Sequence, residues 1–266
     1  MKNYKLYNGV EIPEIGYGTW QIKNEIASNC VQMAIAAGYR HIDSAKVYGN
    51  EVGVGEGIRA SGIKREDIFV TTKVPAEYKT YKKAKQSIEE SLAKLNIGYI
   101  DLILIHCPQP WALFGSPFHY YRQNVKVWKA LEEAYKECKV RAIGVSNFNI
   151  SDLQNIIDHC EIKPMVNQIK VHAGFSELDI IDFCKKNDIV VEAYSPIGHG
   201  HALNNKTVQQ MAEKYGVLAS QLLIKYTLQL GTVSLPKASR KEHIEDNLKL
   251  DFEISEEDMN ILKQLG

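Results

Sequence analysis

The sequence lacks a charge excess of either sign. Its 266 residues contain 32 Lys and Arg against 32 Asp and Glu, so the formal net charge is zero. Proteins that bind the phosphate backbone of nucleic acids rely on a basic excess, and we therefore expect no nucleic-acid partner. With 45% hydrophobic and 24% charged residues, the chain has an ordinary globular composition, without the bias of disordered, collagenous or coiled-coil chains.

Paired cysteines and long apolar runs are also missing. The five cysteines are scattered and include no C-x-x-C pair, which argues against a disulfide framework or a zinc ribbon and suits a reducing compartment. The longest apolar stretch, from Ile97 to Cys107, is interrupted by Asp101 and is too short to span a bilayer. No apolar segment follows Lys2 and Lys5, as a secretory signal would require. We expect a cytoplasmic protein with no membrane partner.

Short β-branched segments alternate with longer segments of helical period, a pattern typical of a parallel sheet with crossover helices. Eight candidate strands recur at the spacing of βα units: 15–19, 39–43, 68–73, 100–106, 140–146, 165–171, 189–194 and 232–236. This number predicts an α/β fold of the closed (β/α)8 TIM-barrel type rather than a doubly wound sheet. Barrels of about 250 residues form one domain, so we expect residues 1–266 to be a single barrel domain.

Two further elements flank this repeat. Segments 4–6 and 10–12 lie on either side of Tyr7-Asn8-Gly9, and Asn-Gly is a strong hairpin signal. We expect an N-terminal β-hairpin that closes the floor of the barrel. Segment 255–265 begins with Ser255 as an N-cap and has Glu257 and Asp258 in its first turn, which predicts a C-terminal helix.

Polar residues at the carboxyl ends of the strands are the candidates for chemistry, because the loops at that end form the active sites of such barrels. Asp43, Lys73 and His106 end three consecutive predicted strands, and Tyr48 lies in the loop after Asp43. A lysine ammonium about 4 Å from a phenol is worth about 4 kcal/mol at an effective dielectric constant near 20, or roughly three pKa units. This effect would bring the pKa of Tyr48 close to working pH.

Asp43 would orient Lys73, and His106 would hydrogen-bond the same substrate oxygen. The set suits protonation of a carbonyl oxygen while a hydride reaches its carbon. Because no side chain supplies hydride, a nicotinamide cofactor is implied.

Several motifs along the chain carry a resemblance to a known family. They are Arg40-His41-Ile42-Asp43-Ser44-Ala45-Lys46-Val47-Tyr48-Gly49-Asn50-Glu51, Thr71-Thr72-Lys73-Val74, Leu104-Ile105-His106, Gly144-Val145-Ser146-Asn147-Phe148, Val166-Asn167-Gln168 and Ala193-Tyr194-Ser195-Pro196. With them the sequence strongly resembles the aldo-keto reductases over nearly its whole length. It looks like their short-tailed microbial type, similar to 2,5-diketo-gluconate reductases, because the chain ends soon after its last predicted helix.

The resemblance implies an NADPH-dependent enzyme that reduces aldehydes and ketones to alcohols. By the same resemblance, Asp43, Tyr48, Lys73 and His106 form the catalytic tetrad, with Tyr48 as the general acid and the nicotinamide as the hydride donor. These roles agree with those argued from the residues.

The resemblance also implies the binding residues. Ser146, Asn147 and Gln168 match positions that hydrogen-bond the nicotinamide carboxamide, and Tyr194 matches a position that stacks on the nicotinamide ring. Ser195 and Ile197 match positions at the pyrophosphate. Lys237 matches a position at the adenosine 2′-phosphate, and Asn247 matches a position at the adenine. The other residues expected at the cofactor are Thr19, Asp43, Ser239, Arg240 and His243. Those expected at the substrate are Trp20, Tyr48, His106 and Trp111, and no metal site is expected.

Two departures from the family pattern bear on specificity. The family usually has Ser directly after the residue matching Lys237 and an Arg six residues after it, where this chain has Ala238 and His243. A neutral histidine lacks the bidentate fork with which arginine binds phosphate, and Arg240 is expected to replace the lost charge. We expect NADP(H) to be preferred over NAD(H), with a smaller margin than usual.

The second departure concerns the substrate. Two tryptophans of the family's pocket are replaced by Pro75 and Cys107, which predicts a more open and polar pocket for small or hydroxylated aldehydes and ketones. Cys107 is not expected to act as a nucleophile, because no activating base is evident. We expect a monomer rather than an oligomer.

Two other functions remain open at this point. His41, Asp43, His106 and His172 are candidate ligands of a metal-dependent barrel hydrolase, although such a site gives Tyr48 no role. A non-catalytic barrel that keeps the cofactor is the second alternative, and the intact tetrad argues against it.

A glycine-rich segment needs a separate interpretation. Gly53-Val54-Gly55-Glu56-Gly57 lies in a helical segment and lacks the G-x-G-x-x-G spacing of a Rossmann phosphate loop. Close packing against the barrel is the expected reason for these glycines.

Overall fold

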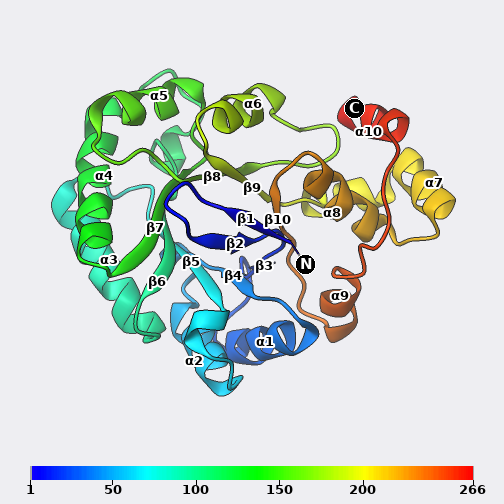
Figure 1. The fold of residues 1–266 in the computed structure, drawn as a ribbon, viewed down its shortest axis with the longest axis horizontal. Helices are drawn as coiled ribbons and strands as arrows, with labels where there is room; N and C mark the ends of the chain where they lie inside the picture. The colour runs from blue at the N-terminus through cyan, green and yellow to red at the C-terminus, as the bar shows by residue number, and fades with distance from the viewer. Residues whose placement is uncertain (1, 266) are drawn as a thin grey trace.

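The structure, a computed structural model, describes residues 2–265, and an eight-stranded parallel sheet forms its centre. The strands are β3 (Tyr17–Gly18), β4 (His41–Asp43), β5 (Phe69–Val74), β6 (Ile100–Ile105), β7 (Val140–Ser146), β8 (Val166–Lys170), β9 (Val190–Tyr194) and β10 (Val233–Leu235). Each strand pairs with the next one along the chain. Figure 1 shows them as a central ring with the helices outside. The predicted (β/α)8 barrel is confirmed.

Backbone hydrogen bonds between the first and last strands close the ring. Gly16 N donates to Ser234 O at 2.8 Å, Ser234 N donates to Glu14 O at 2.9 Å, and Gly18 N donates to Pro236 O at 2.9 Å. The predicted strands 15–19 and 232–236 therefore extend beyond the short ladders of β3 and β10.

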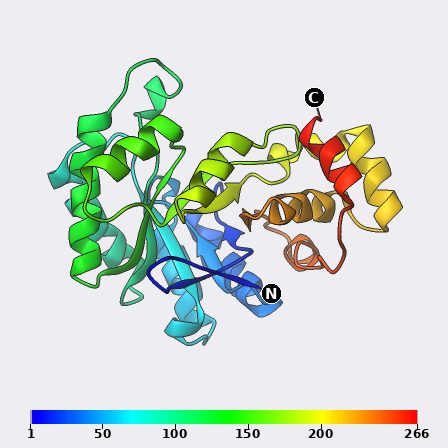
Figure 2. The same ribbon diagram turned by 45° about the horizontal axis from the view of Figure 1, so that its top comes forward.

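Helices alternate with the strands and cover the outside of the barrel. They are α1 (Asn24–Ala37), α2 (Glu51–Ala60), α3 (Tyr81–Leu95), α4 (Tyr121–Lys136), α5 (Ile150–His159), α6 (Leu178–Lys186), α7 (Lys206–Tyr215), α8 (Ala219–Gln229), α9 (Lys241–Asp246) and α10 (Glu256–Lys263). Helices α7, α8 and α10 share a second apolar cluster, and they extend away from the ring at the right of Figure 2. Among the described residues, none of these helices has the length and apolar character needed to cross a membrane.

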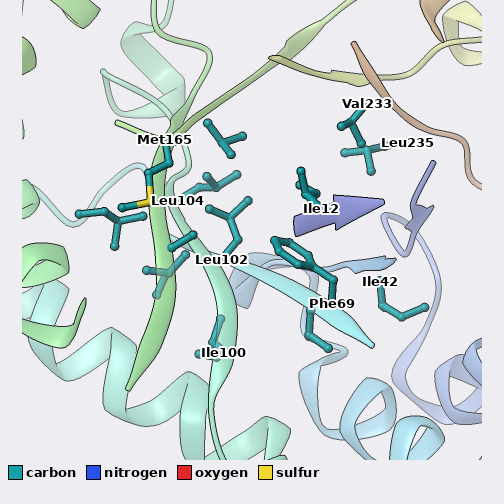
Figure 3. Close-up of a cluster of buried hydrophobic side chains, with 14 of the residues drawn as sticks. Ile12, Ile42, Phe69, Ile100, Leu102, Leu104, Met165, Val233 and Leu235 are labelled. Carbon is teal, nitrogen blue, oxygen red and sulfur yellow. The ribbon is translucent and has the colours of Figure 1, made fainter. Parts of the chain in front are cut away.

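The N-terminal hairpin covers one end of the barrel. Strands β1 (Asn3–Lys5) and β2 (Glu11–Pro13) pair antiparallel, and Gly9 takes the positive φ of +89° that the connection requires. Ile12 on β2 is fully buried and belongs to the same apolar cluster as residues of the barrel strands. Figure 3 shows it beside Phe69, Val233 and Leu235. The hairpin thus closes the barrel floor, as predicted.

Side-chain caps mark the start of α3 and of α10. Helix α3 begins at Tyr81, directly after Thr80, whose side chain accepts a hydrogen bond from Lys83 N. Its first turn exposes Lys82 and Lys83 and buries Ala84. The predicted C-terminal helix is confirmed as α10, whose N-cap Ser255 accepts from Asp258 N.

The glycines of α2 allow close approach to neighbouring helices. A Cβ atom would lie 2.5 Å from Asn24 O at Gly53, 1.9 Å from Leu95 O at Gly55 and 2.6 Å from Ser28 O at Gly57. Close packing, rather than phosphate binding, therefore accounts for this segment.

Candidate active site

Three adjacent strands bring the predicted acid-base residues to the end of the barrel opposite the hairpin. Asp43 ends β4, Lys73 lies in the last two residues of β5, and His106 directly follows β6. Strands β4, β5 and β6 are neighbours in the sheet, so these side chains lie at one rim. Tyr48 reaches the same place from the 3-10 turn Lys46–Tyr48.

Lys73 is the centre of this cluster. Its buried ammonium donates to both carboxylate oxygens of Asp43 at 2.8 Å and to Ser44 O at 2.8 Å, and it lies 3.4 Å from the hydroxyl of Tyr48. Burial, the largest single effect, acts to lower the pKa of Lys73, but Asp43, Tyr48 and Glu192 together outweigh it and the net pKa is raised. Lys73 is therefore charged, and its three hydrogen bonds to Asp43 and Ser44 hold its ammonium beside the Tyr48 hydroxyl.

The loop that carries Tyr48 is held by buried polar contacts. Asn50 donates to Thr19 O and Ile22 O at 2.9 Å each, and its side-chain oxygen accepts from the Ser44 hydroxyl at 2.9 Å. Thr19 Oγ1 in turn donates to Asp43 O at 2.9 Å. The loop is thus fixed at both of its ends to the strands beneath it.

The electrostatic expectation for Tyr48 was wrong in sign. Burial raises the pKa of the Tyr48 hydroxyl, and this effect outweighs the lowering by Lys73, while Asp43 raises the pKa further. The Lys73 ammonium is not a lone charge, because both oxygens of Asp43 share it. Tyr48 is consequently a neutral hydroxyl at neutral pH, which is the form that a proton donor requires.

His106 is also neutral. Burial, with a smaller contribution from Lys73, lowers its pKa well below the usual value. Its ring lies edge-to-face with Tyr48 and with Trp111, with centroid separations of 5.8 and 5.2 Å. Its Nδ1 is buried and has no hydrogen-bond partner within residues 2–265.

The residues expected around the nicotinamide lie on the neighbouring strand ends. Asn147 donates to His106 O at 2.9 Å and to Ser146 Oγ at 3.1 Å, and it accepts from the Tyr194 hydroxyl at 2.8 Å. Gln168 donates both of its N–H groups within the barrel, to Asp43 Oδ1 and to Glu192 Oε2, each at 2.8 Å. Its side-chain oxygen is the group left to accept a hydrogen bond from a carboxamide.

The expected phosphate and adenine residues follow β9 and β10. Ser195 has a φ of +54° and Ile197 is partly buried. Ser239, Arg240 and His243 are exposed, Lys237 is partly buried and Asn247 is buried. Neither Lys237 nor Arg240 forms a salt bridge with any described residue, so both charges are available to an anionic group.

Exposed aromatic side chains lie at the rim beside His106. Trp111 is 41% exposed and packs edge-to-face on Phe114, which is 50% exposed, with centroids 5.7 Å apart. Across the rim, Trp20 is 43% exposed and contacts His199 at a centroid distance of 5.3 Å. Trp20 and Trp111 therefore present indole surface where two other tryptophans were expected to be missing.

Two buried groups near the site were not distinguished by sequence. Glu192, on β9, is completely buried and binds Gln168. The sequence feature that could have identified it is an acidic residue inside an otherwise apolar strand. Lys79 is buried, donates to Cys107 O at 2.7 Å and to Asn124 Oδ1 at 3.0 Å, and burial lowers its pKa to about 8. Burial raises the pKa of Cys107 to about 12, so its thiol is unreactive.

The candidate metal ligands do not converge. Among residues 2–265, no three His, Cys, Asp or Glu side chains group as metal ligands. His41 Nε2 instead lies 3.0 Å from Thr71 Oγ1, and His172 Nδ1 lies 2.8 Å from Ala173 O.

Known proteins resemble this chain in sequence and in fold. The profile of the Aldo/keto reductase family matches residues 14–266. The glyoxal reductase of Bacillus subtilis (strain 168) is 41% identical over 264 residues, which make up 98% of this chain and 92% of that protein. The crystal structure of an aldo/keto reductase from Brucella melitensis superposes with a TM-score of 0.92 at 36% identity, covering 100% of this chain and 99% of that chain.

A further structure shows a relative with its cofactor. The Bombyx mori aldo-keto reductase in complex with NADP superposes with a TM-score of 0.88 at 32% identity, over 99% of this chain and 92% of that chain. Family profile, sequence identity and fold thus agree over nearly the whole length. This chain belongs to the aldo/keto reductase family of oxidoreductases.

Proposed function

We propose that the protein reduces aldehydes and ketones with NADPH and that Tyr48 donates the proton. The observation that carries this proposal is the contact of Tyr48 with Lys73, at 3.4 Å, while Lys73 is itself bound by both oxygens of Asp43. A proton donor needs a protonated resting state and stabilisation of the anion it becomes. Burial supplies the first property and the ammonium supplies the second.

Each polar group at the rim has a distinct task in this mechanism. The carbonyl oxygen of the substrate accepts hydrogen bonds from the Tyr48 hydroxyl and from the neutral ring of His106. As negative charge grows on that oxygen, the Tyr48 proton moves to it, and Lys73 stabilises the phenolate that is left. Asp43 keeps Lys73 charged and prevents it from turning away from the phenol.

The residues present fit a nicotinamide dinucleotide. Gln168 keeps a free side-chain oxygen, and Ser146, Asn147 and Tyr194 would complete the binding of the ring. Lys237 and Arg240, which form no salt bridge with described residues, would hold the 2′-phosphate. When bound, this group supplies the hydride that no protein side chain can supply.

The cofactor preference is tested by comparing kcat/KM for NADPH and NADH. We expect NADPH to be preferred, and Arg240→Ala to raise the KM for NADPH about ten-fold, since a charge-assisted hydrogen bond contributes about 1.5 kcal/mol. The KM for NADH should hardly change in the same variant. A clear preference of the unaltered protein for NADH would contradict the assignment of Lys237 and Arg240.

The substrates are expected to be small carbonyl compounds. The Bacillus subtilis relative is named a glyoxal reductase, and the exposed indoles of Trp20 and Trp111 add apolar surface for aldehydes with an aromatic or aliphatic group. The test is oxidation of NADPH, followed by absorbance, against glyoxal, other dicarbonyls, aromatic aldehydes and keto-sugars. Tight NADPH binding without turnover of any of them would favour a non-catalytic barrel instead.

A further inference from the structure

A buried carboxyl group lies behind the catalytic cluster and has no part in the mechanism above. Glu192 is the third residue of β9 and is completely buried. In the parallel register it pairs with Gln168 on β8 and with Val233 on β10. It stands two residues before Tyr194, and alternate residues of a strand point to the same face.

Hydrogen bonds connect this carboxyl group to the phenol of Tyr48. Glu192 Oε2 accepts from Gln168 at 2.8 Å, and the same amide nitrogen donates to Asp43 Oδ1 at 2.8 Å. Asp43 accepts from Lys73, whose ammonium contacts Tyr48. An amide nitrogen has two hydrogens, so Gln168 satisfies both carboxyl groups at once and holds them on either side of it.

The groups that face Glu192 supply one cation and one carboxylate. His41 and Asp43 approach from β4, Thr71 and Lys73 from β5, and Gln168 from β8; the paired segment of β10 has only Val233, Ser234 and Leu235. His41 Nε2 lies 3.5 Å from Glu192 Oε1, and burial lowers the pKa of His41 to about 3, so it is neutral. The charge of Lys73 is already shared by Asp43, and no second cation balances Glu192 within the described residues.

We propose that Glu192 is a positioning residue: its neutral carboxyl group anchors Gln168 and Asp43 behind Lys73, and its ionisation at alkaline pH opposes loss of the proton from Tyr48. The inference rests on the proposed role of Tyr48. With a neutral Glu192, the cluster of Lys73, Asp43 and Glu192 has no net charge. An ionised Glu192 makes it negative, and a negative cluster opposes formation of the Tyr48 phenolate.

Burial and Asp43 support this assignment, since together they raise the pKa of Glu192 to about 8. The change of charge therefore falls at the alkaline edge of the physiological range. Glu192→Gln has nearly the same shape, is permanently neutral and can still bind Gln168 through its side-chain oxygen. It imitates the protonated form of the native residue.

The first experiment compares the pH dependence of kcat/KM for carbonyl reduction and for alcohol oxidation. In Glu192→Gln we expect the alkaline midpoint to move to lower pH by about half a unit or more, because no negative charge opposes ionisation of Tyr48. The kcat/KM at pH 6.5 should change less than about three-fold. An unshifted midpoint in both directions overturns the proposal.

A matched control is available in α2. Glu51 is also buried and accepts a single side-chain hydrogen bond, from the Thr72 hydroxyl at 2.7 Å, and among the described residues it forms no hydrogen bond or salt bridge with the catalytic cluster. Glu51→Gln should leave the alkaline midpoint unchanged. The same shift in both variants would indicate a general effect of neutralising a buried acid and would overturn the specific role of Glu192.

The second experiment does not use activity and therefore separates this inference from the proposed function. A carboxyl group whose folded pKa lies above its unfolded value near 4.3 binds its proton more tightly when folded, so its contribution to stability is lost as pH rises toward about 8. The Tm of Glu192→Gln minus the Tm of the unaltered protein should therefore increase from pH 5 to pH 8.5. A difference independent of pH contradicts a neutral Glu192.

A direct measurement covers the case in which Glu192→Gln does not fold. Carbon-13 NMR of the unaltered protein with labelled glutamate should show one side-chain carboxyl group that titrates near pH 8. If every glutamate titrates below about pH 6, Glu192 is ionised under working conditions and the proposal fails. If the titration is found but no carbonyl compound is reduced, the assignment of Glu192 stands while the proposed function fails.

Discussion

Replacing Lys73 by methionine removes the ammonium that binds both oxygens of Asp43, and this change tests the fold and the chemistry together. The lysine is 1% exposed and Asp43 is 4% exposed, so the pair is buried. In Lys73→Met, Asp43 retains the hydrogen bond from Gln168 but loses its counter-charge. The stem of methionine fills most of the space, so the main loss is electrostatic.

The magnitude follows from the cost of a buried charge without a partner. Removing one member of a buried ion pair destabilises a protein by about 3–5 kcal/mol. For a chain of this size, 1 kcal/mol corresponds to about 2–4 °C in Tm, so we expect a loss of roughly 6–20 °C. Because an unpaired buried carboxyl group takes up a proton more readily, the loss should be smaller at pH 5 than at pH 8.

The assay is thermal unfolding of Lys73→Met and of the double variant Lys73→Met/Asp43→Asn, with NADPH oxidation measured in parallel. The double variant carries no buried charge at this place and should recover a large part of the lost stability. Both variants should lack carbonyl reduction, because neither stabilises the phenolate of Tyr48. A single variant within about 1 kcal/mol of the unaltered protein, or a double variant as unstable as the sum of the two single changes, would refute the reasoning.

Two further outcomes are expected from the same geometry. Gly55→Ala should reduce the free energy of unfolding, measured with urea, by about 1–3 kcal/mol, because its Cβ would lie 1.9 Å from Leu95 O. Helix propensity alone would instead increase the stability. A measured increase would show that α2 moves freely away from α3. The pH profile of kcat/KM for reduction should show no ionisation near pH 6.5, since burial keeps His106 neutral. A loss of activity below that pH that is abolished in His106→Asn would show that the imidazole of His106 becomes protonated.

Much of the fold was predictable because its strands are buried on both faces. Every residue of β5 and β6 is buried, and each strand is a short run dominated by apolar and β-branched residues that a single sequence displays directly. The clustering of three candidate site residues was predictable for a related reason. Asp43, Lys73 and His106 are charged or polar residues at the ends of such runs, and a closed barrel places those ends together.

The properties of the site depended on contacts that sequence spacing does not reveal. Gln168 and Asp43 are 125 residues apart and share a hydrogen bond across the barrel. That contact engages the amide hydrogens of Gln168 and connects Glu192 to the cluster. The pKa of Tyr48 depended on burial and on the division of the Lys73 charge with Asp43, and both are tertiary properties.

Trp20 and Trp111 were expected at the substrate, but the aromatic contacts around Trp111 were not visible in the sequence. Phe114 and Trp111 lie in a segment without helical or strand period, and their edge-to-face contact with each other and with His106 arises from the path of the loop. Phe114, which the sequence did not single out, adds aromatic surface beside Trp111.

The most direct test of the account is Tyr48→Phe, measured for both cofactor binding and turnover. The change deletes the hydroxyl that lies 3.4 Å from Lys73 and leaves the ring that packs edge-to-face on His106. We expect kcat for carbonyl reduction to fall by at least about 10²- to 10⁴-fold, while the Kd for NADPH changes less than about three-fold. Turnover near the native rate in Tyr48→Phe would contradict the assignment of Tyr48 as the proton donor.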